Sequence, residues 1–228
     1  MILSDIMNIW KKKDLLTQAI NDSKEMLEIA YELYTYVQKH ILEPNGKKID
    51  IQEVKKRDYL LNHFDKSIRK KVFEHVSLNE KEDQDLYSAF ILISIVKDME
   101  RLGDYTKNIS EVAELRDRLS NDKYTKIAHE LLKEMEIMFK ETLNSYRETD
   151  YTKAQKINDL HFSYKTRIDN LLLDLVKMDN VESNLVIYGL LYRYLKRLSA
   201  HLMHITTSIT NPIDEIGYYA KGDNKGGL

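Results

Sequence analysis

Apolar residues recur at alternating spacings of three and four along most of the chain, which is typical of helices that pack along one side against other helices. The spacing in the first such stretch predicts a helix from about residue 12 to about residue 42. Its inward positions are Leu16, Ile20, Ser23, Leu27, Ala30, Tyr34, Val37 and Ile41. The helix is expected to end at Pro44-Asn45-Gly46, because these residue types favour turns.

Five further stretches follow the same rule. They predict helices over about residues 50–76, 84–115, a segment after Ser120-Asn121-Asp122 that ends before Thr149-Asp150, 151–176 and 183–209. Polar connections are expected at 77–83 and 178–182, and Asn211-Pro212 is expected to follow the last helix. The pattern therefore predicts six long helices in two groups of three.

The third and sixth predicted helices share a short sequence pattern, which suggests an internal repeat. The matched pairs, all at one constant offset, are Arg101 with Arg197, Leu102 with Leu198, Gly103 with Ser199 and Ile109 with Ile205. A glycine inside a helix costs about 1 kcal/mol relative to alanine. The small residues Gly103 and Ser199 therefore predict a close helix crossing in each half.

These patterns predict an all-α fold of two tandem three-helix bundles that arose by internal duplication. The first repeat is expected to occupy residues 1–119, with a short N-terminal extension. The second is expected to occupy residues 120–228, with a frayed C-terminal tail at Gly222 to Leu228.

The composition agrees with this fold and excludes several classes of protein. The chain of 228 residues has only 7 glycines and 2 prolines, too few for the turns of a sheet protein. Its net charge of -2 gives no basic field for nucleic acid. The absence of cysteine excludes disulfides and thiolate metal sites. We expect no membrane span, since no run approaches the roughly 20 apolar residues required, and a cytoplasmic location.

One acidic pair and one histidine pair are candidate metal ligands. Glu100 and Asp104 are four residues apart, so both carboxylates lie on one helix face, where a bound cation would relieve their repulsion. The alternative is an acidic face that is solvated or neutralised by neighbouring basic side chains. His201 and His204, three apart, could bind a transition metal or could simply pack. A nucleophile motif, a glycine-rich phosphate loop and a Glu-x-x-His pattern are all absent, so we expect no enzyme.

The stretch 99–105, which reads Met-Glu-Arg-Leu-Gly-Asp-Tyr, resembles the signature of the PhoU family of phosphate-signalling regulators. That signature has an acid, then three residues, then Asp, often with Arg directly after the first acid. Residues 194–201 resemble the family's second copy of this motif. There the acids are replaced, with Lys196 at the position of Glu100 and Ala200 at the position of Asp104.

This resemblance implies two three-helix bundles side by side, a cytoplasmic location and a homodimer. It implies negative control of phosphate uptake and starvation signalling through contact with a phosphate transporter subunit, a sensor histidine kinase or both. Iron, zinc or another divalent cation is implied on the acidic motif at Glu100 and Asp104, and none at Lys196 and Ala200.

Three other functions are compatible with the same sequence pattern. The chain could be a metal-binding helical adaptor for another transporter, or a structural helical-bundle protein unrelated to phosphate. A metal-dependent enzyme is the third, although the sequence shows only one convincing acidic pair for its site.

Overall fold

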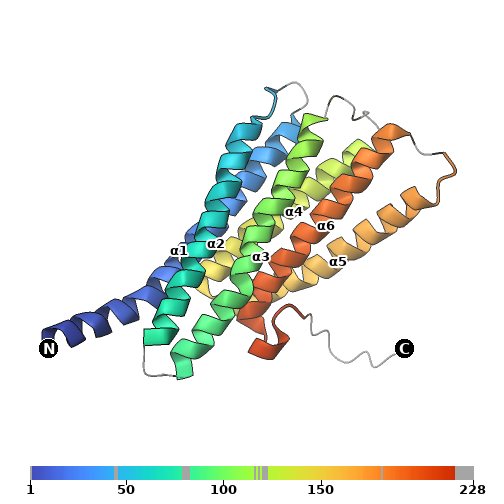
Figure 1. Cartoon of the computed structure of the whole chain (residues 1–228). Coiled ribbons are helices and arrows are strands. Elements are labelled where there is room, and N and C mark those ends of the chain that lie inside the picture. The colour runs from blue at the N-terminus through green and yellow to red at the C-terminus, as the bar shows by residue number, and fades with distance from the viewer. Residues whose placement is uncertain are drawn as a thin grey trace, which may run out of the picture.

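A computed structural model describes residues 2–43, 46–78, 83–115, 117, 119, 123–180 and 182–218, and it shows six long α-helices (Figure 1). The elements are α1 (Ile2–Leu42), α2 (Ile51–Leu78), α3 (Asp83–Glu114), α4 (Lys123–Glu148), α5 (Tyr151–Val176), α6 (Ser183–Thr210) and the short 3-10 helix η2 (Ile213–Glu215). These described ranges contain no strand, so the predicted all-α class is confirmed. None of the described helices is long and apolar enough to cross a membrane.

The helix boundaries agree with the sequence pattern to within one or two residues, except at the start of α1. That helix begins at Ile2 rather than near residue 12. Its first turns contain no proline or glycine that would stop a helix, and in Figure 1 they extend beyond the rest of the bundle. The predicted breaks at Pro44-Asn45 and Ser120-Asn121-Asp122, and the tail at Gly222 to Leu228, lie outside the described residues.

The connection between α4 and α5 is as short as the sequence predicts. Thr149 adopts a left-handed backbone conformation with φ 53°, which turns the chain back within two residues. Asp150 then caps α5, because its Oδ1 accepts a hydrogen bond from the backbone N–H of Lys153 at 3.0 Å. Helices α4 and α5 therefore run antiparallel and in contact.

Each half of the chain forms a three-helix unit. Helices α1, α2 and α3 pack on one another, and so do α4, α5 and α6. Between the halves the main contacts join α3 to α6 and α1 to α4 (Figure 1). These contacts join helices at equivalent positions in the two units, and the internal duplication stays a prediction.

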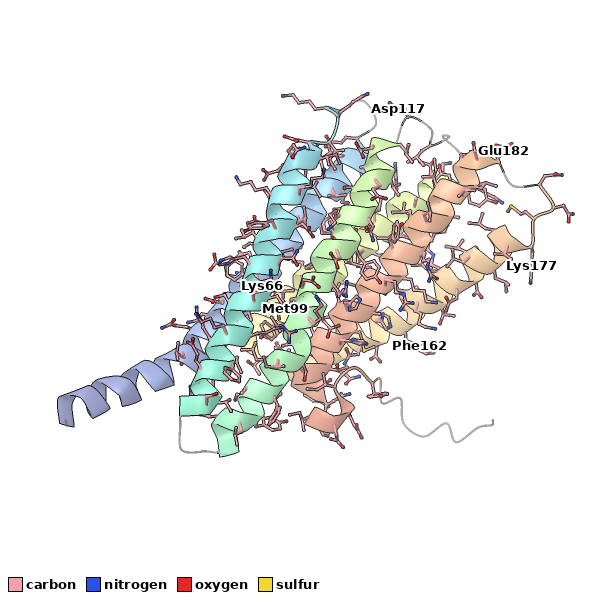
Figure 2. All side chains as sticks on the ribbon, in the orientation of Figure 1. Lys66, Met99, Asp117, Phe162, Lys177 and Glu182 are labelled. Carbon is pink, nitrogen blue, oxygen red and sulfur yellow. The ribbon has the colours of Figure 1, made fainter. Side chains whose placement is uncertain are left out.

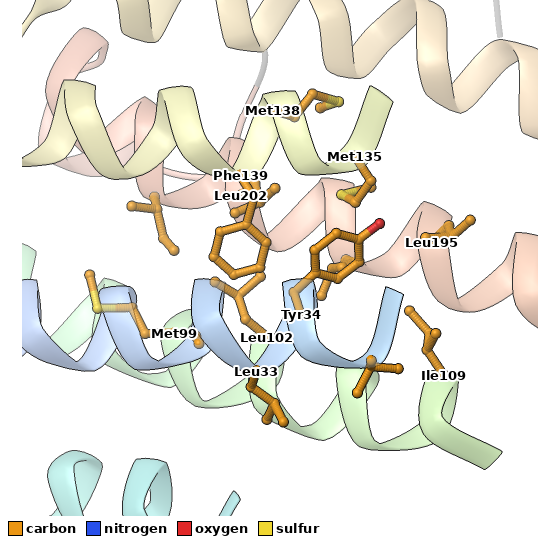
Figure 3. Packing of buried hydrophobic residues seen from close by; sticks show 14 of the residues in the cluster. Leu33, Tyr34, Met99, Leu102, Ile109, Met135, Met138, Phe139, Leu195 and Leu202 are labelled. Atoms are coloured by element: carbon orange, nitrogen blue, oxygen red, sulfur yellow. The ribbon is translucent and has the colours of Figure 1, made fainter. Parts of the chain in front are cut away.

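The two halves share one continuous hydrophobic core. Figure 3 shows residues from both halves within it. Tyr34 of α1 stacks on Phe139 of α4 at 5.7 Å between ring centres, and its hydroxyl donates to the backbone oxygen of Leu132 at 2.7 Å. This buried phenol has its polar group satisfied across the two halves. The division of the chain into repeats at residues 119 and 120 stays a prediction.

A close helix crossing occurs at Gly103, as predicted. A methyl group on Gly103 of α3 would lie 2.4 Å from Leu61 Cδ1 of α2, and Leu61 is fully buried. In the other half, Ser199 of α6 is fully buried and its Oγ lies 3.0 Å from His161 Nδ1 of α5. The third helix of each unit therefore contacts the second at its small residue, and a close crossing at Ser199 stays a prediction.

Replacing Gly103 by alanine is expected to give a less stable protein than replacing Gly189 by alanine. Both changes remove the cost of a helical glycine, about 1 kcal/mol. At Gly189 the new methyl would meet only Leu175 Cδ1, at an ordinary 3.7 Å. At Gly103 it must displace buried Leu61, and such overpacking costs about 1–3 kcal/mol. Urea unfolding measures the free energy of unfolding of the two variants. An equal gain in stability at both positions would contradict the close crossing.

The protein is expected to lose stability as pH falls from about 6.5 to 4 because of His161. Burial lowers the pKa of His161 to about 4, and the charges of His204, Lys165 and Lys196 add to the shift. In the unfolded chain a histidine has a pKa of about 6.5. The unfolded state therefore takes up a proton in this range that the folded state does not. The stability present above pH 6.5 should fall by about 3 kcal/mol by pH 4.

Urea unfolding at several pH values across this range measures the effect. His161→Gln, which keeps a hydrogen-bonding group near Ser199, is expected to reduce the loss. His63→Gln is the matched control, since His63 is exposed on α2. If the His161 variant loses stability as steeply as the parent protein, the assignment to His161 is wrong.

Candidate functional site at the junction of the two halves

The first acid of the α3 motif, Glu100, is buried next to basic side chains of its own helix. Its side chain is 7% exposed, and its Oε2 lies 2.7 Å from Lys97 Nζ and 3.8 Å from Arg101 Nε. A carboxylate is costly to bury unless a cation accompanies it. Lys97 provides that cation here.

The second acid, Asp104, also has basic partners. Its Oδ2 accepts a hydrogen bond from Arg101 Nη1 at 2.6 Å, and its Oδ1 lies 3.6 Å from Lys107 Nζ. Lys107 also donates to Asp58 of α2 at 2.7 Å. Burial lowers the pKa of Lys107, but the hydrogen bond and charge of Asp58, with Asp104, outweigh this and raise it. The acidic pair thus has the neutralised arrangement that the sequence left open, and metal binding at Glu100 and Asp104 stays a prediction.

The matching positions on α6 have a different role. Lys196, at the position of Glu100, donates a hydrogen bond to Asp169 of α5. Burial raises the pKa of Asp169, but hydrogen bonds from Lys196 and Lys165 outweigh this and lower it. At this position the second half therefore holds a cation that ties α6 to α5, and Ala200 offers no ligand atom.

A second group of polar side chains lies where α3 meets α6. Asp98 of α3 accepts hydrogen bonds at its Oδ1 from His201 Nδ1 at 2.7 Å and from His204 Nδ1 at 3.1 Å. Asp98 directly precedes Met99, which is labelled in Figure 2 at the middle of α3. Among the described residues, this is the one place where three His, Asp or Glu side chains bring potential ligand atoms within 4.8 Å of one another.

Surrounding residues hold the two imidazoles in place. His201 stacks on Tyr105 of α3 at 5.4 Å between ring centres, and its ring meets that of His204 edge-on. After α6 the chain folds back over His204 at Gly217, where φ is +88° and a methyl group would lie 3.5 Å from His204 Cδ2. The Gly217 N–H donates to Thr207 Oγ1 at 2.8 Å and fixes this turn.

The carboxylate of this cluster is kept ionised by its partners. Burial raises the pKa of Asp98, but the hydrogen bonds and charges of His201 and His204 outweigh this and lower it. The three side chains are partly exposed, with 16% for Asp98, 18% for His201 and 35% for His204. The cluster is thus both ordered and open to ions from solvent.

The sequence indicated His201 and His204 as a pair but not Asp98. Two residues along a helix turn about 200°, so Asp98 faces a different direction from Glu100 of the motif. Asp98 and Tyr105 are seven residues apart and both face α6, which is a weak signal for a packed face. Their partners are about 100 residues away in sequence, so only the packing of α3 on α6 identifies them.

Comparisons with known proteins support one family. Residues 16–113 match the family model described as the PhoU domain. The phosphate-specific transport system accessory protein PhoU homolog of Clostridium acetobutylicum is 28% identical over 162 residues, 67% of this chain and 72% of that protein. The corresponding homolog 1 of Thermotoga maritima is 23% identical over 228 residues, 95% of this chain and 86% of that protein.

Two solved structures have the same fold. PhoU from Pseudomonas aeruginosa has a TM-score of 0.65 and 16% identity, and the match covers 89% of this chain and 95% of that one. The phosphate transport system regulatory protein PhoU from Streptococcus pneumoniae has a TM-score of 0.66 and 16% identity, over 87% and 94% of the two chains. The α3 motif lies within the stretch that matches the PhoU domain, and the two solved structures show that the chain has the fold of PhoU proteins.

Proposed function

We propose that this protein regulates phosphate transport and phosphate-starvation signalling by binding a phosphate transporter subunit, a sensor histidine kinase or both. The observation that carries the proposal is its likeness, over 67% and 95% of the chain, to two proteins named as phosphate-specific transport system accessory proteins. The matching fold of two PhoU structures, one of them named a phosphate transport system regulatory protein, supports it. Negative control, a cytoplasmic location and a homodimer of two-repeat chains belong to the same proposal.

The exposed helix faces support action by contact rather than by catalysis. Tyr59 and Phe73 of α2 are 74% and 72% exposed, and Val176 at the end of α5 is 81% exposed. Aromatic side chains on helix surfaces often become the central contacts of a protein interface. The charged groups of the α3 motif, by contrast, are occupied by ion pairs with one another.

Deleting the gene in its host is expected to release phosphate uptake and starvation signalling from control when phosphate is plentiful. Uptake of labelled phosphate and a starvation-responsive reporter measure the two effects, and the wild-type gene should restore both. Normal uptake and normal signalling in the deletion strain would contradict the proposal.

Capture of partners from the host's membranes separates this function from its alternatives. We expect a phosphate transporter subunit or a sensor kinase to be recovered. The variant Tyr59→Ser with Phe73→Ser tests whether the exposed face of α2 binds the partner, because neither side chain belongs to the core. Recovery of a different transporter alone would contradict the phosphate role and favour the adaptor.

Metal binding by the acidic pair is a separate proposal that rests on the family resemblance. A divalent cation at Glu100 and Asp104 would have to displace Lys97 and Arg101 from the carboxylates. Metal analysis of the purified protein is expected to show a lower content in Glu100→Ala with Asp104→Ala. An unchanged metal content in this variant would contradict metal binding by the acidic pair.

A further inference from the structure

Side chains from both halves of the chain converge at Asp98, His201 and His204. We propose that these three residues bind one divalent first-row transition-metal ion, which bridges α3 and α6. The ligand atoms are Oδ1 of Asp98 and Nδ1 of each histidine. This site differs in residues and position from the acidic pair of the α3 motif.

The donor set suits such an ion. Two imidazole nitrogens and one carboxylate oxygen are the protein ligands of many zinc and non-haem iron(II) sites. Imidazoles bind a metal in their neutral form, so the one ionised aspartate gives the ligand set a net charge of about -1, which favours a divalent cation. Three protein ligands leave further coordination positions for water or an exchangeable anion.

The distances from Asp98 Oδ1 to the two histidine nitrogens are close to those between ligand atoms around a bound metal ion. Asp98 Oδ1 lies 2.7 Å from His201 Nδ1 and 3.1 Å from His204 Nδ1. Ligand atoms around an ion at about 2.0–2.2 Å lie roughly 3.0–3.5 Å from one another. Without an ion, each Nδ1–H donates a hydrogen bond to the carboxylate. With an ion, each imidazole would carry its proton on Nε2 and offer the Nδ1 lone pair to the metal.

The surroundings hold the ligands ready for an ion. Asp98 lies on α3, and the two histidines lie three residues apart on α6, so all three are carried by long packed helices. Stacking on Tyr105 restricts the ring of His201, and the turn at Gly217 restricts His204. Ligands restrained in this way lose little conformational freedom when a metal binds.

The cluster differs from the acidic motif in the partners of its carboxylate. Glu100 lies against Lys97, and Asp104 lies against Arg101 and Lys107. A cation at those carboxylates must compete with fixed positive charges. At Asp98 the partners are imidazoles, which serve as metal ligands themselves.

The test is titration of the purified full-length protein, stripped of metal with a chelator, with Zn²⁺ by calorimetry and with Co²⁺ by visible absorption. We expect one saturable site per chain that depends on this cluster, separate from any ion held by Glu100 and Asp104, with Co²⁺ bands of a nitrogen- and oxygen-ligated site. Asp98→Asn, His201→Gln and His204→Gln should each weaken binding by more than about tenfold. Far-UV circular dichroism shows that each variant is folded.

Two control variants make the assignment specific. His63→Gln removes an exposed histidine of α2 and should bind as the parent does. Glu100→Gln with Asp104→Asn removes any ion held by the acidic pair and should keep the ion whose binding depends on Asp98, His201 and His204. The absence of saturable binding in the parent would overturn the proposal. So would folded cluster variants that bind as tightly as the parent, or loss of binding only in the acidic-pair variant.

Discussion

Helices α3 and α6 bury their apolar faces against each other at the centre of the molecule, while each also closes the three-helix unit of its own half. Leu102 and Ile109 of α3 and Leu195 and Leu202 of α6 are fully buried in the shared core. Burial of one such side chain stabilises a protein by about 1.5–3 kcal/mol. The halves therefore cannot separate without exposing much of the core, and the two three-helix units form one body.

The residues at matching positions of α3 and α6 have different roles in the two halves. On α3 the acids remain and are neutralised by basic residues, mainly of the same helix. On α6 the lysine at the first motif position, Lys196, holds Asp169 of α5 instead. The contact between α3 and α6 then creates a polar cluster that neither repeat contains alone, at Asp98, His201 and His204.

The sequence predicted the features that depend on residues close together in the chain. Helix limits followed from spacing and breaks, as at Thr149-Asp150, and the close crossing of α2 and α3 followed from Gly103. The early start of α1 was missed, because a short stretch without inward spacing can still be helical. Asp98 was missed because its partners are on another helix of the other half. The ion pair of Lys196 with Asp169 was missed because its two residues lie on different helices of the second half, 27 residues apart in the sequence.

A double-mutant cycle between Asp98 and His201 tests the central claim, that α3 of one half lies directly against α6 of the other. Urea unfolding of the parent, Asp98→Asn, His201→Gln and the double variant, with chelator present, gives the coupling energy. Residues in contact are coupled by about 0.5–3 kcal/mol, whereas distant ones add independently within about 0.3–0.5 kcal/mol. The structure predicts coupling in the first range. Strict additivity would contradict the junction between the two halves.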